Sequence, residues 1–469
     1  MADLECCSYM LPLLTCCLFF IYTICYMITT SSRTSDDHLA PKSYPVIGCL
    51  VDFYRNRRRL LAWYTSLLAA SPSQTIVVDR LGARRTVVTA NPANVEHILK
   101  SNFVNYPKGK PFTDVLGDLL GGGIFNVDGD AWYAQRKLVS HEFSARVIRD
   151  TVGVALEREA AATLVPALDA ASAGDGGMAV VDMQELLRQF AFNVVCRVAL
   201  GGDGEMALAP LPLARLASAV IHDAVMVFVR RRRRNNNLAS ASGGGGLVAR
   251  MSAAGYGDEA IRDAVVSFIM AGRDTTSSAL TWFFWLMSRH RDVEAQILLD
   301  SSSSGATVLL HAALCETMRL YPPVAWDSKH AADDDTLPDG TRVRRGDRVT
   351  YFPYGMGRME SIWGTDAGEF RPARWMTSSS SPASEGVSPF KWPVFQGGPR
   401  TCLGKEMAFV QMKFVAAAVL RRFELRPVAA AEGSPPPEFV PLLTAHMAGG
   451  LKVTVRRRSQ RRQNGTCGR

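Results

Sequence analysis

The sequence predicts a mainly helical fold with a minor β portion, preceded by a single N-terminal transmembrane helix. An uncharged apolar stretch, Cys6–Ile28, lies near the start of the chain. Most of the remaining chain carries apolar residues at the spacing of helix faces, and β-branched runs are short and few. Because 47% of the 469 residues are hydrophobic, the chain can bury a large core.

Four parts are expected along the chain. They are a membrane anchor over 1–30, a proline-containing linker over 31–50, one large domain over 51–455 and a basic disordered tail over 456–469. The prolines of the linker block helix continuation and stiffen it.

The stretch Cys6–Ile28 is long enough to cross a hydrocarbon core as one helix. The alternative is a cleaved signal peptide, which needs a basic start and a shorter apolar core. Acidic Asp3 and Glu5 precede the stretch, which favours the anchor, and basic Arg33 and Lys42 follow it. The positive-inside rule places that following side, and hence the main body, in the cytosol.

Charge and cysteine usage narrow the choice of partners. The formal net charge of +9 favours acidic proteins or an anionic membrane surface. The positive charge gathers in 230–234 and 456–462, which are expected to be a loop and a chain end, so no nucleic acid partner is expected. The ten cysteines include no Cys-x-x-Cys pair, which argues against a zinc site or disulfide framework and favours a reduced, cytosolic body.

The other elements follow from local patterns. Runs at Gln74–Val78 and Thr86–Thr89 predict a β-hairpin, and Asn91-Pro92 predicts the start of a helix that ends near Lys100. Further helices are expected over 132–143, 145–170, 183–200, 258–290, 309–320 and 402–423, strands over 341–350 and 452–455, and loops over 230–246, 301–305, 378–381 and 435–437.

The segment Phe395–Gly404 carries the most specific signal. Two glycines and a proline predict a tight loop, which enters an apolar helix expected to begin at Cys402. The amides at a helix N-terminus favour a thiolate over a thiol there. Arg400 is placed to contact an anionic group. For a lone cysteine, a buried structural residue would be the simpler interpretation.

The whole pattern decides against that interpretation. Phe395, Gly398, Arg400, Cys402 and Gly404 resemble, at all five fixed positions, the haem-binding signature of the cytochrome P450 superfamily. The resemblance implies the fold of that superfamily and a haem b whose iron is bound by the Cys402 thiolate. It also implies that Phe395 and Gly404 border the haem and that Arg400 contacts a haem propionate.

A second match supports the first because it lies upstream in the expected order. Glu316 and Arg319 resemble the Glu-x-x-Arg helix of the superfamily, and their i,i+3 spacing lets the two charges pair. The resemblance implies that Arg374 completes a structural triad with them.

Two further segments are similar to propionate-binding segments of the superfamily. Trp132 and Arg136 resemble its Trp-x-x-x-Arg helix, whose two side chains reach one propionate. The alternative for this pair is a cation–π contact on a surface helix. Lys329 is expected to be another propionate contact, and its neighbour His330 is the alternative.

The helix expected over 258–290 should cross the core, because apolar side chains cover nearly its whole circumference. Its centre breaks this pattern with Gly272, a charge pair and two hydroxyls, as is typical of functional sites. The resemblance implies that Thr275 hydrogen-bonds dioxygen or its water, Asp274 relays protons and Ala271 packs over the haem. The alternative is a polar stripe that faces solvent.

The implied activity needs an electron donor. The resemblance implies a monooxygenase that receives electrons from NADPH through cytochrome P450 reductase, because this chain has no second domain for nicotinamide or flavin. Gly121–Gly123 follows no strand and is not a dinucleotide fingerprint. An acidic reductase would suit a basic docking face, although an ordinary solvated helix face is the alternative. The candidate docking residues are Lys137, Arg400, Lys405, Lys413, Arg421 and Arg422.

Other segments narrow the resemblance to the plant fatty-acid ω-hydroxylase branch, namely 123–130, 326–329, 337–340, 351–358 and 389–391. This implies an endoplasmic reticulum membrane enzyme that hydroxylates a fatty acid at or near the ω position. ω-Oxidation of jasmonoyl-isoleucine is the alternative, since both substrates are amphipathic carboxylates with an apolar part. The expected substrate-lining residues are Phe112, Phe268, Val324, Ala325 and Trp326.

Two regions depart from the pattern of this branch. Over 201–256, where two helices usually cover the substrate, we expect only a short helical run, an arginine run and a Gly/Ser stretch. Over 291–309, a serine run replaces the usual helix and loop. A haem-binding protein with impaired catalysis is therefore a second hypothesis. A haem-thiolate isomerase or dehydratase is a third, which the intact Asp274 and Thr275 disfavour.

Overall fold

The computed structural model describes most of the expected domain. The described residues are Thr15, Leu18, Phe19 and Tyr22, followed by 41–44, 46–173, 179–200, 218–238, 246–300, 306–378, 381–382, 386–428 and 435–458. Apart from four residues, the predicted anchor Cys6–Ile28 lies outside this part. Among the described residues, no helix combines the length and apolar character that crossing a membrane requires.

Helices make up most of the described chain, as predicted. They are α2 (Leu50–Asn56), α3 (Leu60–Ala70), α4 (Pro92–Glu96), α5 (Lys110–Leu120), α6 (Gly129–Val139), α7 (Ala145–Val147), α8 (Gly153–Glu159), α9 (Val165–Ala173), α10 (Met183–Leu200), α11 (Ser218–Leu238), α12 (Leu247–Ala253), α13 (Asp258–Arg289), α14 (Arg291–Asp300), α15 (Ala306–Leu320), α16 (Pro353–Met356), α17 (Glu360–Trp363) and α18 (Lys405–Arg422).

The strands form a minor portion. The largest sheet has four strands in the order β1 (Thr75–Val78), β2 (Thr86–Thr89), β7 (Arg348–Tyr351) and β4 (Asp327–His330). A three-stranded sheet orders β10 (Phe423–Pro427), β13 (Lys452–Arg457) and β3 (Val180–Asp182). Three small pairs complete the described strands: β5 (Asp335–Thr336) with β6 (Arg342–Val343), β8 (Met376–Ser378) with β9 (Ser381–Pro382), and β11 (Phe439–Val440) with β12 (His446–Met447).

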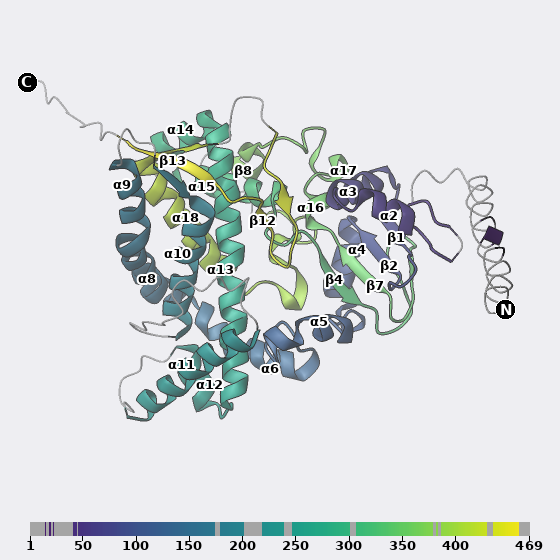
Figure 1. The fold of residues 1–469 in the computed structure, drawn as a ribbon, viewed down its shortest axis with the longest axis horizontal. Helices are drawn as coiled ribbons and strands as arrows, with labels where there is room; N and C mark the ends of the chain where they lie inside the picture. Colours follow the sequence, from purple (N-terminus) through teal and green to yellow (C-terminus); the bar gives the residue numbers. More distant parts are fainter. Residues whose placement is uncertain are drawn as a thin grey trace, which may run out of the picture.

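Helix α13 runs through the middle of the molecule, with α8–α10 and α18 to one side and the four-stranded sheet with α2–α4 to the other (Figure 1). One apolar core packs the middle and end of α13 against α10, α15 and α18. A second core packs the sheet against α3, and a third packs α11 and α12 against the first half of α13. The centre of α13 therefore lies where the helical and sheet regions meet.

Several element predictions are confirmed. The hairpin β1–β2 forms with Thr75 opposite Thr89. Helix α4 begins at Pro92, and the Asn91 side chain caps it by accepting a hydrogen bond from the Ala93 amide at 2.9 Å. Helices α10 and α13 have the predicted bounds to within one residue.

Other boundaries were wrong. The helix after the cysteine loop begins at Lys405 rather than Cys402, because the chain turns through Leu403 and Gly404. The helix expected from Trp132 begins three residues earlier, at Gly129. The strand expected over 341–350 is two strands, β6 and β7, separated by a turn in which Gly346 has φ +84°. The basic tail is in part ordered, since β13 extends to Arg457; residues 459–469 lie outside the described part.

The two regions that depart from the family pattern contain helices after all. Helix α11 continues through the arginine run to Leu238, and α12 follows it, so the predictions of a loop at 230–238 and of only a short helical run before it were wrong. Helix α14 occupies 291–300, where a replaced helix was expected. The serine run 301–305 lies outside the described residues, and the length of these regions relative to the family remains a prediction.

Candidate active site

The loop that carries Cys402 is closed by its own backbone. The Cys402 amide donates to the Phe395 carbonyl at 2.8 Å, and the Thr401 amide donates to the Gly398 carbonyl at 3.1 Å. Gly398 has φ +62°, and a Cβ there would lie 1.9 Å from the Leu99 carbonyl oxygen. Only glycine fits this position, so the second glycine of the motif is required by a close backbone approach.

The Cys402 side chain is surrounded by protein but keeps part of its surface exposed. Its surface is exposed, yet the surrounding protein raises the pKa of the thiol by burial. The Gly404 amide and the charges of Arg136 and Lys405 oppose that rise without cancelling it. The Gly404 amide thus favours the thiolate, as predicted for this end of the loop, but burial has the larger effect on the pKa of the haem-free protein. A sulfur that protein surrounds but that keeps exposed surface is suited to bind the metal of a large cofactor.

The predicted helix Trp132–Arg136 faces this loop. The Arg136 guanidinium donates to the Thr401 carbonyl at 2.7 Å and carries charge close enough to act on the Cys402 thiol. The Arg400 guanidinium lies 4.5 Å from the centre of the Trp132 ring, which is buried. The cation–π contact of the alternative is present, with the Arg136 guanidinium 5.6 Å from the centre of the Trp132 ring, but its placement on the surface is wrong because Trp132 is buried.

Arg400 is an interior residue. Its guanidinium contacts the Asp128 carboxylate at 2.5 Å and the Val127 carbonyl at 3.0 Å, and only 9% of its side chain is exposed. Its expected place on a basic docking face is therefore wrong. Its expected place beside an anionic group of the cofactor is compatible with this burial and remains a prediction.

Lys329 lies in a buried charged cluster beside the loop. Its ammonium contacts Asp327 Oδ2 at 3.1 Å, and the Lys108 ammonium contacts Asp327 Oδ1 at 2.8 Å. Burial opposes ionisation of Asp327, but the two lysines outweigh it and hold the pKa of this carboxyl well below its usual range. His330 lies on the opposite face of β4, where its Nδ1 contacts the Lys108 carbonyl, so Lys329 rather than His330 faces the same side as Asp327.

This region has a surplus of positive charge. Arg400 acts electrostatically on Lys329, and Arg136 acts on Arg400, so the charges form one group. Its members are the cations Lys108, Lys329, Arg136 and Arg400 and the anions Asp128 and Asp327, which leaves two positive charges without a partner among them. The two propionates of a haem b would neutralise that surplus, and its iron would be within the reach of Cys402. The residues present therefore fit haem.

The centre of α13 is more exposed than the segments on either side of it. Most residues of this helix are buried, but Ala271, Gly272, Asp274 and Thr275 keep part of their surface exposed. Thr275 donates its hydroxyl to the Ala271 carbonyl at 2.6 Å, the back-bonding expected to loosen the helix ladder. The alternative of a solvent-facing polar stripe is disfavoured, because buried residues flank the segment on both sides.

Asp274 turns toward α10 and not toward Thr275. Its carboxylate lies 3.6 Å from Arg188 Nε and 3.5 Å from Arg273 Nε. Arg188 also contacts Glu185, whose side chain is 63% exposed. The carboxylate predicted to relay protons thus begins a chain of charged groups that reaches the surface.

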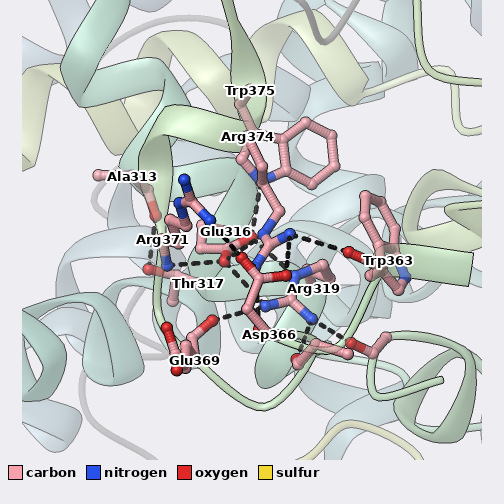
Figure 2. Close-up of polar contacts among 12 residues, drawn as sticks. Ala313, Glu316, Thr317, Arg319, Trp363, Asp366, Glu369, Arg371, Arg374 and Trp375 are labelled. Carbon is pink, nitrogen blue, oxygen red and sulfur yellow. Dashed lines mark hydrogen bonds and ion pairs between the residues drawn. The ribbon is translucent and has the colours of Figure 1, made fainter. Parts of the chain in front are cut away.

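The predicted triad of Glu316, Arg319 and Arg374 is assembled in the structure (Figure 2). Both Glu316 and Arg319 are fully buried, with Arg319 Nε 2.7 Å from one carboxylate oxygen and Arg374 Nε 2.9 Å from the other. The Trp375 indole N–H donates to the same carboxylate at 2.8 Å. Arg319 also donates to the backbone carbonyls of Gly357, Ala367 and Glu369, so it holds two loop segments, one at Gly357 and one over Ala367–Glu369, against α15.

The expected substrate-lining residues differ in how much of their surface is exposed. Phe112, Val324 and Trp326 keep part of their surface exposed, as a lining residue must. Phe268 stacks on Phe143 at 5.3 Å, and both Phe268 and Ala325 are buried in the apolar cores, at 7% and 2% exposure. These two have less exposed surface than the other three, and their assignment as lining residues remains a prediction.

The proposed docking residues also differ in exposure. Lys137, Arg421 and Arg422 are exposed, Lys405 and Lys413 are half-buried, and burial lowers the pKa of Lys413.

Phe395 and Gly404, which were expected to border the haem, lie close to aromatic rings. The ring centres of Phe395 and Phe409 of α18 are 5.3 Å apart, and a Cβ at Gly404 would lie 3.3 Å from the Phe143 ring. Gly404 thus allows close approach of a side chain as well as any cofactor.

Sequence reasoning missed the residues that complete the charged cluster. Lys108, Asp327, Tyr351 and Gln396 come from four distant segments and share one network of hydrogen bonds. No local motif marks them. The only available signal was that Asp327 and Lys329 alternate in a strand that follows the Glu-x-x-Arg helix.

Comparisons with known proteins agree with this site. A family model described as Cytochrome P450 matches residues 39–216 and 206–448. The chain is 50% identical to cytochrome P450 94B1 of Arabidopsis thaliana, over 90% of this chain and 92% of that protein. It is also 50% identical to cytochrome P450 94B3 of the same plant and 39% identical to cytochrome P450 94A2 of Vicia sativa, with coverage of 92% or more of each chain. A crystal structure of the cytochrome P450DA heme domain shares the fold, with a TM-score of 0.72, 20% identity and coverage of 90% of this chain and 97% of that one.

Proposed function

Because the chain belongs to the cytochrome P450 family, we propose that it hydroxylates a fatty acid at or near the terminal methyl group, using dioxygen and electrons from NADPH. Membership of the family makes it a haem-dependent monooxygenase and an oxidoreductase, and both the predicted superfamily and its plant branch are confirmed. The substrate, the position of oxidation and the electron donor belong to the proposal.

One observation carries the oxidative part of the proposal: the enclosed but exposed sulfur of Cys402 beside a cluster with two surplus positive charges. When bound, haem supplies dioxygen activation, because a thiolate ligand pushes electron density onto iron and favours O–O cleavage. Arg136, Arg400, Lys329 and Lys108 would hold the propionates.

The residues of α13 have separate roles in this proposal. The Thr275 hydroxyl can exchange its hydrogen bond with the Ala271 carbonyl for one with dioxygen or water. Asp274 would exchange protons with water near Thr275, while the guanidiniums of Arg188 and Arg273, which keep their own protons, hold its carboxylate in place. This arrangement supports a monooxygenase over the haem-thiolate isomerase or dehydratase, which has no use for a proton supply of this kind.

The fatty-acid substrate rests on the resemblance of several segments to the plant ω-hydroxylase branch. A substrate of this class needs an apolar approach to the iron, and the exposed surfaces of Phe112, Val324 and Trp326 are suited to it. Helices α11 and α12 pack over the first half of α13, which favours turnover over the hypothesis of a haem-binding protein with impaired catalysis.

An NADPH–cytochrome P450 reductase is the proposed donor, with the exposed residues Lys137, Arg421 and Arg422 as candidate contacts for an acidic partner. We also propose that Cys6–Ile28 anchors the protein in the endoplasmic reticulum membrane with the catalytic domain in the cytosol. Alkaline carbonate extraction and protease protection of microsomes test the anchor, and release of the full chain by carbonate would contradict it.

The central experiment uses microsomes that contain the full chain and a plant reductase. The reduced carbon-monoxide difference spectrum reports thiolate ligation, and ω-labelled fatty acids of several chain lengths are assayed beside jasmonoyl-isoleucine. A thiolate spectrum with NADPH-dependent ω-hydroxy fatty acid supports the proposal. Product only from the hormone conjugate would support the alternative substrate, and a thiolate spectrum without any product would support impaired catalysis. Cys402→Ala, expected to abolish both spectrum and product, is the control.

A further inference from the structure

Gln396 occupies an unusual position in the cysteine loop. Its φ is +64°, and among the described residues only Val46 and Gln74 share a positive φ without being glycine. Gln396 follows Phe395, whose carbonyl accepts the hydrogen bond from the Cys402 amide. The backbone conformation of Gln396 therefore determines where the loop closes on Cys402.

The side chain of Gln396 uses both ends of its amide. Its Nε2 donates to Asp327 Oδ2 at 2.7 Å, and its Oε1 accepts a hydrogen bond from the Tyr351 hydroxyl. The Tyr351 hydroxyl also lies 2.9 Å from Asp327 Oδ2, so its single proton is shared between these two acceptors and the three side chains form a ring of polar contacts. Asp327 and Tyr351 are direct partners in the β4–β7 pairing, which makes the far side of the ring rigid.

This ring joins the loop to the charged cluster. The same Asp327 carboxylate accepts from Lys108 and Lys329, whose charge surplus fits the haem carboxylates. Asp327, Lys329 and Tyr351 are buried, with 8%, 1% and 1% of their surface exposed. Water has little access to replace a lost hydrogen bond at these groups.

The chemistry of the side chain is specific. Glutamate at 396 would place a second carboxylate against Asp327, and methionine would leave a carboxylate oxygen and a hydroxyl without their amide partner. Glutamine alone among residues of its length offers a donor to Asp327 and an acceptor to Tyr351.

We propose that Gln396 is a positioning residue that fixes the loop of Cys402 relative to the cluster for the haem carboxylates. The loop would hold the iron through Cys402, whereas three of the four cations for the carboxylates, Lys108, Arg136 and Lys329, come from other parts of the chain. Gln396 ties these two parts together. This inference rests on haem binding at the proposed monooxygenase site, but not on any substrate.

The test compares Gln396→Met with Gln411→Met in the full-length protein. Gln411 is also a buried glutamine, on α18, but its amide nitrogen has no hydrogen-bond partner among the described residues. The measurements are the rate of haem transfer to apomyoglobin and the rate at which the reduced carbon-monoxide complex converts from its thiolate to its thiol form. Gln396→Met is expected to raise both rates about tenfold, the effect of one or two buried hydrogen bonds, and Gln411→Met to change them little.

A fold defect is separated from a positioning defect in two ways. Circular dichroism of the haem-free proteins should be the same for both methionine variants. Tyr351→Phe, which removes the hydroxyl contacts with Gln396 and Asp327 and keeps the Gln396–Asp327 bond, should raise haem loss by a smaller factor and, combined with Gln396→Met, should add less than its own effect. If Gln396→Met does not fold, Gln396→Asn takes its place in this cycle.

The outcomes are distinct. Equal haem loss from Gln396→Met and Gln411→Met, or fully multiplicative effects in the double variant, would overturn the inference. If the wild-type protein itself lacks the thiolate spectrum, the proposed haem site is wrong. Failure to oxidise any fatty acid would leave these rates measurable and affect only the proposed substrate.

Discussion

Two buried charged clusters flank the cysteine loop, and they differ in one respect. The cluster around Glu316 pairs its two carboxylates, Glu316 and Asp366, with the buried guanidiniums of Arg319 and Arg374, and its third cation, Arg371, is 61% exposed to solvent. The cluster around Asp327 contains more cations than anions. The first is complete from the protein alone, whereas the second reaches neutrality only with an anionic ligand. The difference identifies the first as a structural clamp and the second as part of a binding site.

The largest effect is expected from breaking the complete cluster. Glu316→Ala leaves Arg319 buried and unpaired and removes acceptors from Arg374 and Trp375. Breaking one side of a buried ion pair costs about 3–5 kcal/mol, so the variant should fail to accumulate as folded protein. Expression level and thermal unfolding measure this. A variant that folds normally and only loses haem would show that the Glu316 cluster is not independent of the ligand.

A smaller effect is expected in the incomplete cluster, and it should depend on haem. Lys329→Met removes a buried cation that would pair with a propionate, and leaves Lys108 to compensate Asp327. Haem should be lost about 10-fold faster while the haem-free protein remains folded, because a charge-assisted hydrogen bond contributes about 1.5–3 kcal/mol. Haem transfer and circular dichroism check the two parts. If the haem-free Lys329→Met protein does not fold, the Asp327 cluster stabilises the fold in the same way as the Glu316 cluster.

The pH dependence of the haem-free protein sharpens the same comparison. Burial lowers the pKa of Lys329 to about 7, an effect that Asp327 opposes only in part, whereas the unfolded chain has the ordinary lysine value of 10.5. Between these values the unfolded state binds more protons than the folded state, so stability should rise as the pH increases from 7 to about 10. Urea unfolding at pH 7 and 9 should show a gain for wild type that is smaller in Lys329→Met. An equal gain in both proteins would exclude Lys329 as the source.

The smallest effect is expected at the rim of the complete cluster. Arg371 contacts Asp366, but its side chain is 61% exposed. Exposed ion pairs contribute about 0–1 kcal/mol, so Arg371→Ala should lower stability by less than 1 kcal/mol, whereas Arg374→Ala, at 10% exposure, should cost several times more. Chemical denaturation of the two variants gives the ratio. Similar losses would show that the guanidinium of Arg371 matters as much as the buried one.

The sequence predicted the parts of the site that lie in single local segments. The cysteine loop and the centre of α13 each carry their chemistry within about ten consecutive residues, and Glu316–Arg319 needs only helical spacing. The ring of Asp327, Tyr351 and Gln396 could not be predicted, because it depends on the β4–β7 register and on one backbone angle. The start of α18 at Lys405 was missed because a turn and a first helical turn have the same composition there.

The prediction for helix α11 was wrong for a different reason. Its arginine run suggested a loop, although arginine is a good helix former. Ile221, Val225 and Val229 lie four residues apart on one face, and all three are buried against α13. The apolar spacing was present in the sequence and was outweighed by the charge of the segment, so a helix with a narrow apolar face was mistaken for a solvated linker.

The parallel pairing of β2 with β7 has a consequence for synthesis of the protein. Thr86 pairs with Arg348, so the β1–β2 hairpin leaves the ribosome long before the strand that covers its edge. Until then, that edge presents unsatisfied amides and carbonyls to any other nascent chain. A chaperone that protects the first hundred residues during translation would therefore increase the yield of folded enzyme more than one that acts on the finished chain.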